Sequence, residues 1–190
     1  MKENQYIVLK KKVDFATKNL KNCCKTGCSF CCYQLIEVFD FEEQTIKDAI
    51  NKLDDNNKAI IKKNLESWFT FFNENTPNEK VLDEHDTISN MINLGLSKKH
   101  PCPLLINNLC SIYNNRPLAC RVHVVESNPE LCEKDPYRAS SKESHSIRNK
   151  IFSEIKQKKG KYYMTFLPYI ATEIIKIESQ IKPIKKLYIK

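Results

Sequence analysis

The chain has 190 residues, nine of them cysteines, and a formal net charge of +8 with the thiols counted as neutral. This length suits one domain with a real hydrophobic core and is too short for two sizeable domains. Residues 1–12 are polar and lysine-rich, and no apolar run is long enough to cross a bilayer, so we expect a cytoplasmic location and no membrane partner. Disulfides rarely persist in the cytosol and nine is an odd number, so the cysteines are expected to be metal ligands or reactive thiols.

Basic residues form small clusters at 10–12, 156–161 and 182–190. Such runs are more often solvated faces than binding sites for nucleic acid or an anionic surface. No nucleic-acid-binding motif accompanies the charge, so nucleic acid is not the partner that we expect.

The first predicted helix spans residues 6–22 and is followed at once by five cysteines within ten residues. Its apolar spacing is typical of a short amphipathic helix. The side chains expected on its buried face are Val8, Val13, Phe15, Ala16 and Leu20.

The cysteine-rich stretch that follows suggests metal chemistry. Cys24, Cys28 and Cys31 are spaced i, i+4 and i+7, so a helical turn would place them on one face, with Cys32 at its edge. Gly27 weakens a helix there and favours a turn that brings backbone close to a metal. Thiolates gathered this tightly repel one another unless a cation or a cluster takes up their charge. The stretch therefore predicts a metal or iron–sulfur site.

Two helices are predicted after an extended segment at residues 33–39. Asp40, with Glu43 three residues on, is a variant of the capping box and opens a helix that runs to residue 53. A second helix covers residues 58–73. The expected core positions of the two are Phe41, Ile46, Ala49, Ile50, Leu53, Ile60, Ile61, Leu65, Trp68, Phe69 and Phe72. The aromatic residues resemble a cofactor box, but at helical spacing we interpret them as ordinary packing.

A shorter helix at residues 83–96 ends before the two prolines at 101 and 103, and the sequence then becomes rich in turns. Cys102, Cys110 and Cys120 are expected in loops, where backbone N–H groups are free to donate to sulfur. Arg116 and Arg121 flank Cys120, and their charge would favour its thiolate. They either support a metal site or are surface ion-pair partners, and the sequence leaves both open.

The C-terminal part is predicted to hold helices at residues 144–158 and 164–180. Gly160 would stop the first, and Pro168 is allowed in the first turns of the second. The basic tail after Pro183 is expected to be loose. The fold class that we expect is mainly α: one helical domain, 1–190, whose irregular cysteine-rich loops converge on a metal site, with a cysteine-cluster core at about 22–135 and C-terminal helices at about 144–182.

Three motifs follow one another along the chain: the leading cysteine cluster, C-P-x-L at residues 102–105, and C-x-I-Y-x-x-R-P-x-x-C-R at 110–121. Together they resemble the CxxCxxCC cysteine-cluster family, a zinc- or iron-chelating domain to which flagellin lysine N-methylases are related. The resemblance spans residues 24–132.

The resemblance implies a set of metal ligands. These are Cys24, Cys28, Cys31, Cys32, Cys102, Cys110 and Cys120, with Cys132 as an eighth candidate. Three residues separate Cys24 from Cys28 where the family name implies two, so either Cys23 or Cys24 is the first ligand. Zinc takes four ligands and so does a [4Fe–4S] cluster, which leaves open two sites or one site with spare thiols.

The function that we expect is metal binding by cysteines, holding an iron–sulfur cluster, first of all [4Fe–4S], or zinc, with a redox or methyl-transfer task. One alternative is a protein N-methylase of the radical type that uses S-adenosylmethionine, because Cys24, Cys28, Phe30 and Cys31 fit C-x-x-x-C-x-aromatic-C. The missing strand–helix alternation argues against it. A second alternative is a zinc-stapled module whose helices meet a protein partner.

A fourth hypothesis, a catalytic cysteine nucleophile, needs a histidine beside a thiol. His123 is near Cys120 in the sequence, whereas His85, His100 and His145 are scattered. Surface or packing roles suit these histidines better than catalysis, and His123 is a further candidate to bind or support the metal.

Overall fold

The structure is a computed structural model that describes residues 2–24, 26–75, 100–135, 138–157, 162–181 and 187–189. It is mainly helical, as the sequence predicts. Among the residues described, no helix is both long and apolar enough to span a bilayer. The predicted helix at 83–96 and its hydrophobic positions lie outside these residues, as do Gly160 and Pro183.

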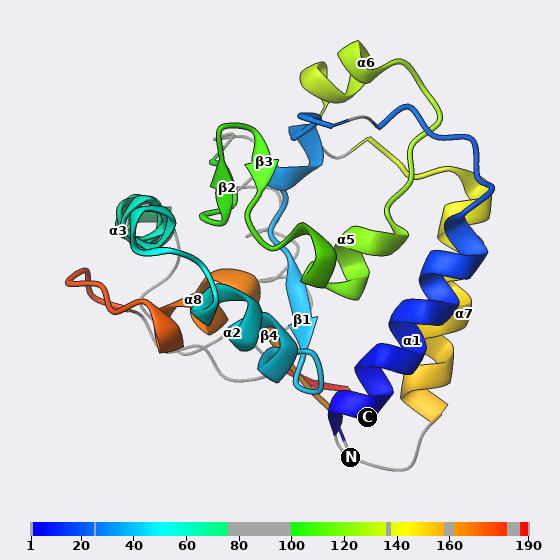
Figure 1. Ribbon diagram of the computed structural model, residues 1–190. Coiled ribbons are helices and arrows are strands. Elements are labelled where there is room, and N and C mark those ends of the chain that lie inside the picture. The colour runs from blue at the N-terminus through cyan, green and yellow to red at the C-terminus, as the bar shows by residue number, and fades with distance from the viewer. Residues whose placement is uncertain are drawn as a thin grey trace.

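One hydrophobic core, the α1 core, lies between helices α1 (Lys2–Thr17), α5 (Leu118–Val122) and α7 (Lys142–Gln157). Figure 1 shows α1 and α7 running side by side, with α5 next to them. The buried side chains of this core are Tyr6, Leu9, Val13, Phe39, Phe41, Leu118, Val122, Ile151 and Ile155.

The predicted buried face of the first helix is wrong except at Val13 and, in part, Leu20. Val8 and Ala16 are exposed, and Phe15 is 83% exposed. The true face uses Tyr6, Leu9 and Val13, spaced i, i+3 and i+7. Tyr6 had been missed because its polar end had no visible partner in the sequence; in the fold its hydroxyl donates to the carbonyl of Arg116 at 3.2 Å.

The second core, the α3 core, lies between α2 (Glu43–Asn51), α3 (Asp55–Asn75) and α8 (Leu167–Ile174). Ile46 and Ile50 of α2 are fully buried, as predicted. The aromatic side chains of α3 pack as a cluster, with Trp68 stacked on Phe72 at 4.7 Å between ring centroids and edge-on to Phe69 at 4.9 Å. This confirms that they are packing residues. Two of the thiols, Cys102 and Cys110, lie against this core.

A three-stranded antiparallel sheet of order β1-β4-β5 connects the two cores. Its strands are β1 (Glu37–Phe39), β4 (Tyr162–Phe166) and β5 (Leu187–Ile189). The extended segment predicted at residues 33–39 is confirmed only for Glu37–Phe39, because Tyr33 lies in a 3-10 turn. The predicted helix at 164–180 is wrong at both ends, because β4 occupies its start and α8 ends at Ile174.

Pro168 does lie in the first turn of α8, as predicted. The tail that was expected to be loose contributes β5, whose Tyr188 lies opposite Tyr163 in β4. The predictions for β4 and β5 failed for the same reason. A strand is stabilised by pairing with another strand elsewhere in the chain, and no local pattern reveals that partner.

Helix α2 begins two residues after Phe41, and the predicted cap is displaced. Glu42, rather than Asp40, is the N-cap residue, and the carboxylate that reaches back belongs to Glu42, not Glu43. Its Oε2 accepts from the N–H of Phe39 at 3.0 Å, while its Oε1 accepts from the N–H of Leu118 at 2.7 Å. A single buried carboxylate therefore connects β1 and α2 to the start of α5.

The cysteine segments are short and irregular, and Figure 1 shows the N-terminal one passing beneath helix α6 (Pro129–Lys134). They contain the 3-10 turns η1 (Phe30–Tyr33) and η2 (Tyr113–Asn115) and the hairpin of β2 (Leu105–Ile106) and β3 (Leu109–Cys110). The expected helical face carrying Cys24, Cys28 and Cys31 is wrong. Gly27 has φ of +84°, a left-handed conformation that breaks any helix, so the predicted turn is confirmed instead.

Candidate metal centre

The two cysteine segments meet through their backbones. The N–H of Cys102 donates to the carbonyl of Cys32 at 2.7 Å, although seventy positions separate them in the numbering. Close by, the hydroxyl of Ser29 donates to Asn108 Oδ1 at 3.3 Å. Asn107 and Asn108 have φ of 50° and 62°, the left-handed values that a two-residue hairpin turn needs and that asparagine tolerates. The β2–β3 hairpin is therefore held against the N-terminal thiol stretch.

Helix α3 fixes the other side of this hairpin. Nδ2 of Asn64 donates to the carbonyl of Pro103 at 3.1 Å and to that of Leu105 at 3.2 Å. Pro103 directly follows Cys102, and Leu105 lies three residues after it. A single side chain therefore sets the path of the backbone after that thiol.

Replacing Asn64 with Ala should therefore loosen the loop without damaging the α3 core. We expect a loss of about 1–2 kcal/mol in the free energy of unfolding and a several-fold faster transfer of bound metal to a chelator. Thermal unfolding and chelator kinetics measure the two effects. Lys63→Ala, on the exposed face of the same helix, is the matched control. Identical chelator kinetics in both variants would contradict the role given to Asn64.

Backbone N–H groups donate to the sulfurs of Cys102 and Cys110. Burial raises the pKa of Cys102 to about 12, and a hydrogen bond from the N–H of Leu104 opposes the rise. Burial likewise raises the pKa of Cys110, against a hydrogen bond from the N–H of Ile112. N–H donors at sulfur stabilise thiolate ligands and tune the centres that they hold. In both loops the donor lies two residues after the cysteine.

Five thiols lie where the two cysteine segments meet, and we call them the five-thiol group: Cys31, Cys32, Cys102, Cys110 and Cys120. A hydrogen bond from Cys32 lowers the pKa of Cys31 to about 7, against burial, and the Arg116 guanidinium lowers it further. The same hydrogen bond, with burial, raises the pKa of Cys32. Burial, and then Cys31, Cys102 and Cys110, raise that of Cys120 well above its usual range. Cys120 lies in helix α5 and not in the predicted loop.

The other four cysteines gather around α6. Cys132 is buried in that helix, and its pKa is raised by burial, by the charge of Cys23 and a hydrogen bond to it, and by Cys28. Cys23 is fixed to the segment before α6, because its N–H donates to the carbonyl of Val125 at 2.8 Å. Partial burial, and then the charges of Cys23, Cys28 and Cys31, raise the pKa of Cys24 to about 12, while a hydrogen bond from the N–H of Val125 opposes the rise.

All nine cysteines lie in the described ranges and none forms a disulfide. Within those ranges, no three Cys, His, Asp or Glu side chains are placed to hold one metal ion as they stand. Each thiol that becomes a ligand must release a proton, and burial opposes that release at Cys102, Cys110 and Cys120.

Arg116 is the cation of the five-thiol group. Its charge lowers the pKa of Cys31, Cys110 and Cys120, after the larger effects of burial and hydrogen bonding. Its guanidinium lies 4.2 Å from the ring centroid of Tyr113, and its Nε is buried with no hydrogen-bond partner among the residues described. A buried donor without an acceptor is costly. A negatively charged metal–thiolate centre beside it would supply the missing acceptor, so the residues present fit such a group.

Arg116→Gln should weaken metal retention by about tenfold, the scale expected for residues that act on a metal's ligands from outside. Arg116→Lys restores the charge but not the flat guanidinium, so it should recover only part of the loss. Competition against a chromophoric chelator gives the affinities, and the helical circular dichroism should stay unchanged. Equal affinities in the wild type and Arg116→Gln would contradict this role.

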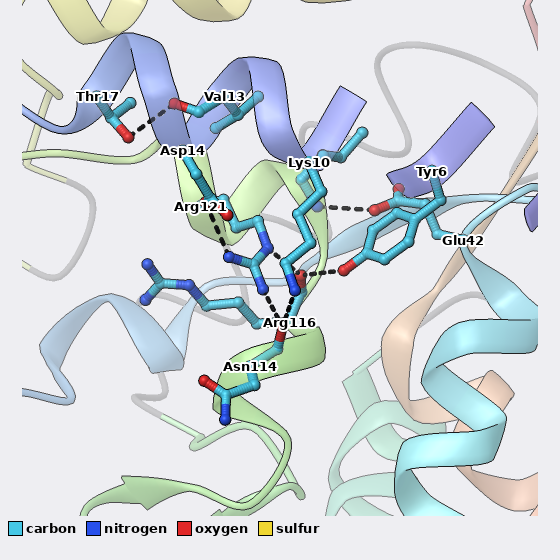
Figure 2. A network of polar contacts seen from close by, with 10 residues as sticks. Tyr6, Lys10, Val13, Asp14, Thr17, Glu42, Asn114, Arg116 and Arg121 are labelled. Carbon is cyan, nitrogen blue, oxygen red and sulfur yellow. Dashed lines mark hydrogen bonds and ion pairs between the residues drawn. The ribbon is translucent and has the colours of Figure 1, made fainter. Parts of the chain in front are cut away.

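Arg121 does not lie at the surface. It is 7% exposed and forms an ion pair with Asp14 of α1 at 3.0 Å. Figure 2 shows it also donating to the backbone carbonyls of Asn114 and Arg116. The predicted role as a surface ion-pair partner is therefore wrong for Arg121. It holds the backbone between Cys110 and Cys120 in place, and its charge lowers the pKa of Cys110, against the larger effect of burial.

Together with Arg121, three residues of α1 hold the backbone of residues 114–116, and we call this arrangement the clamp. The sequence did not predict these three residues. The hydroxyl of Tyr6 donates to the carbonyl of Arg116, Lys10 donates to that of Asn114 at 2.8 Å, and Asp14 pairs with Arg121 (Figure 2). Their spacing of i, i+4 and i+8 marks one stripe of the helix, the only signal that could have revealed them.

The three described histidines have other surroundings. His100 stacks on Phe71 and lies 3.3 Å from the hydroxyl of Ser67. Nδ1 of His145 lies 3.1 Å from Nδ2 of Asn149. Burial lowers the pKa of His123, with a further contribution from Arg148. None of these contacts pairs a histidine with a thiol; His85 lies outside the described residues.

Comparison with protein families gives one match, which covers residues 22–150. The matching family is CxxCxxCC, described as a "putative zinc- or iron-chelating domain". The chain belongs to the CxxCxxCC family. The sequence resemblance is thereby confirmed, and with it a metal-binding role in which cysteines are the ligands. No curated protein and no solved structure matches the chain.

Proposed function

We propose that this member of the CxxCxxCC family holds a resident iron–sulfur cluster, with ligands taken from both cysteine segments. The observation that carries the proposal is the hydrogen bond between Cys102 and Cys32, which joins the segments in the middle of the five-thiol group. The ligands are drawn from Cys31, Cys32, Cys102, Cys110 and Cys120. When bound, a cluster supplies one-electron redox chemistry.

The spacing of the thiols favours a cluster over a single zinc ion. Around one zinc ion four sulfurs stand about 3.8 Å apart, as follows from a Zn–S bond of about 2.3 Å. In a [4Fe–4S] cluster each iron takes one thiolate, so the sulfurs stand farther apart. The described thiols influence one another, but no three of them are placed to hold one metal ion as they stand. A cluster, whose ligand sulfurs stand farther apart, suits such a group better than a single ion.

What this chain's own residues do toward the cluster can be stated. The N–H groups of Leu104 and Ile112 donate to ligand sulfurs, and Arg116 balances negative charge. The α3 core covers one side of the group and excludes water from Cys102 and Cys110. The N–H groups and Arg116 stabilise bound thiolate over free thiol, whereas burial against the α3 core opposes ionisation of these thiols.

A radical methylase that uses S-adenosylmethionine fits less well. Such enzymes need parallel strands alternating with helices, whereas every strand pair among the residues described is antiparallel. A zinc-stapled module with a protein partner remains the second candidate, because the same thiols would hold zinc after larger side-chain movement. It predicts metal without redox activity.

Purification without oxygen separates the candidates. Iron, acid-labile sulfide and zinc are assayed on one sample, and its visible spectrum is recorded before and after dithionite. The proposal predicts brown protein with about equal iron and sulfide and partial bleaching by dithionite. Colourless protein with zinc and no sulfide would overturn the cluster and support the staple.

A further inference from the structure

The nine thiols fall into two groups whose backbones are fixed by different contacts. The five-thiol group is built on the β2–β3 hairpin. Cys102 donates to the carbonyl of Cys32, Leu105 donates to that of Cys102 at 3.0 Å, and Leu105 lies opposite Cys110 in the hairpin. The chain then reaches Cys120 through the segment that α1 clamps. Neither α6 nor the segment before it takes part in these contacts.

The four-thiol group is built on α6 and the segment that precedes it. The N–H of Cys23 donates to the carbonyl of Val125 at 2.8 Å, and the N–H of Val125 donates back to the sulfur of Cys24. These two hydrogen bonds to Val125 fix the positions of Cys23 and Cys24 beside the segment that precedes α6. Asn128 caps α6 by accepting from the N–H of Glu130 at 3.1 Å, and that helix presents Cys132 to Cys23.

The electrostatic neighbours of each thiol follow the same division. Those of Cys132 are Cys23 and Cys28, and those of Cys120 are Cys31, Cys102 and Cys110. The two groups are in contact, because Cys31 also acts on Cys24. Helix α6 contacts η1, so the groups are neighbours and not distant sites.

The numbers of thiols agree with the division. A four-coordinate metal or a [4Fe–4S] cluster uses four cysteines. The group around α6 has enough thiols for one such centre: Cys23, Cys24, Cys28 and Cys132. The other five thiols are enough for a second. A single centre would leave five thiols without a metal, several of them gathered where their thiolates repel one another.

We infer that the chain holds two tetrathiolate metal centres: one bound by Cys23, Cys24, Cys28 and Cys132, and the other by four of the five thiols around the β2–β3 hairpin. This inference rests on the proposed metal-binding function and extends it. Cys23 and Cys24 are then both ligands, and Cys132 is a full ligand of its own centre. The first centre is the more accessible, because Cys24 is exposed.

The number of centres is measured directly by native mass spectrometry of the full chain purified without oxygen, with metal and sulfide assayed on the same sample. The wild type should carry two centres. Cys132→Ser and Cys24→Ser should each carry one, and so should the double variant Cys102→Ser/Cys120→Ser, which leaves only three thiols in the five-thiol group. Ser153→Ala, on the exposed face of α7, is the control and should carry two.

The identity of the lost centre provides the sharper test. Combining Cys132→Ser with Cys24→Ser should remove nothing beyond the single change, whereas adding Cys132→Ser to Cys102→Ser/Cys120→Ser should remove all metal. If Cys102→Ser/Cys120→Ser does not fold, the variant Cys132→Ser/Cys24→Ser still decides, because both its changes fall in one group. One centre in the wild type, or two in Cys132→Ser, would overturn the inference and leave the proposed function intact. A wild type without metal would overturn both.

Discussion

Arg121→Met is expected to lower the free energy of unfolding by about 3 kcal/mol, or about 1 kcal/mol for each hydrogen bond that the guanidinium donates. The guanidinium is 7% exposed and donates to three acceptors: Asp14 and the carbonyls of Asn114 and Arg116. Methionine occupies a similar volume but donates nothing. Among the residues described, the two carbonyls then keep only Lys10 and Tyr6 as donors, and the Asp14 carboxylate, at 48% side-chain exposure, loses its ion pair and turns to water.

Chemical denaturation of the variant measures this loss, and a thermal midpoint about 10 °C lower should accompany it. Arg148→Met is the matched control, because Arg148 is exposed and its guanidinium lies 5.2 Å from the ring centroid of Phe152. Its cost should stay below about 1 kcal/mol. A loss under 1 kcal/mol in Arg121→Met would show that the clamp of α1 on the Asn114–Arg116 backbone contributes little to stability.

The second large effect is a dependence of stability on pH that comes from Glu42. Burial raises the pKa of this carboxyl from 4.5 to about 7, although two backbone N–H groups and Arg121 oppose the rise. Between these two values the folded chain keeps the proton and the unfolded chain loses it. The free energy of unfolding therefore falls as pH rises through this window, by about 3 kcal/mol in all, and the contribution is lost above pH 7.

Glu42→Gln removes this titration and keeps the shape of the side chain. Its amide oxygen still accepts one N–H, while its amide nitrogen faces another donor, so the variant should be less stable at pH 5 by about 1–3 kcal/mol. The difference from the wild type should then shrink or reverse by pH 8. Glu133→Gln, on the exposed side of α6, controls for a general loss of negative charge. Parallel stability curves for wild type and Glu42→Gln would rule out the protonated Glu42.

The local hydrophobic pattern was enough to predict the helices whose buried residues recur at the helical period. Ile46 and Ile50 of α2, and the aromatic residues of α3, lie where the 3.6-residue period puts them. The same reasoning failed where a partner lies far away in the chain. Residues of β4 were predicted as helix because their partner strand is β1, more than a hundred residues earlier.

The candidate site divides in the same way. The sequence predicted Cys102, Cys110 and Cys120 as metal ligands only through the family resemblance, and nothing local revealed that the N–H of Cys102 donates to the carbonyl of Cys32. The i, i+4, i+7 spacing in the first stretch was misleading, because Gly27 breaks the helix that it implied. Glu42 and the α1 stripe went unnoticed, since a buried polar residue is recognised by its partners and these are far apart in sequence.

The central claim is that thiols from both ends of the cysteine-rich region hold the same metal centre. Alkylation with iodoacetamide, followed residue by residue in native protein purified without oxygen, tests it most directly. A sample kept reduced and freed of metal by a chelator corrects for burial. We predict that metal protects Cys31 and Cys102 equally and that both lose protection in one kinetic phase when chelator is added. Protection of one without the other would contradict the claim.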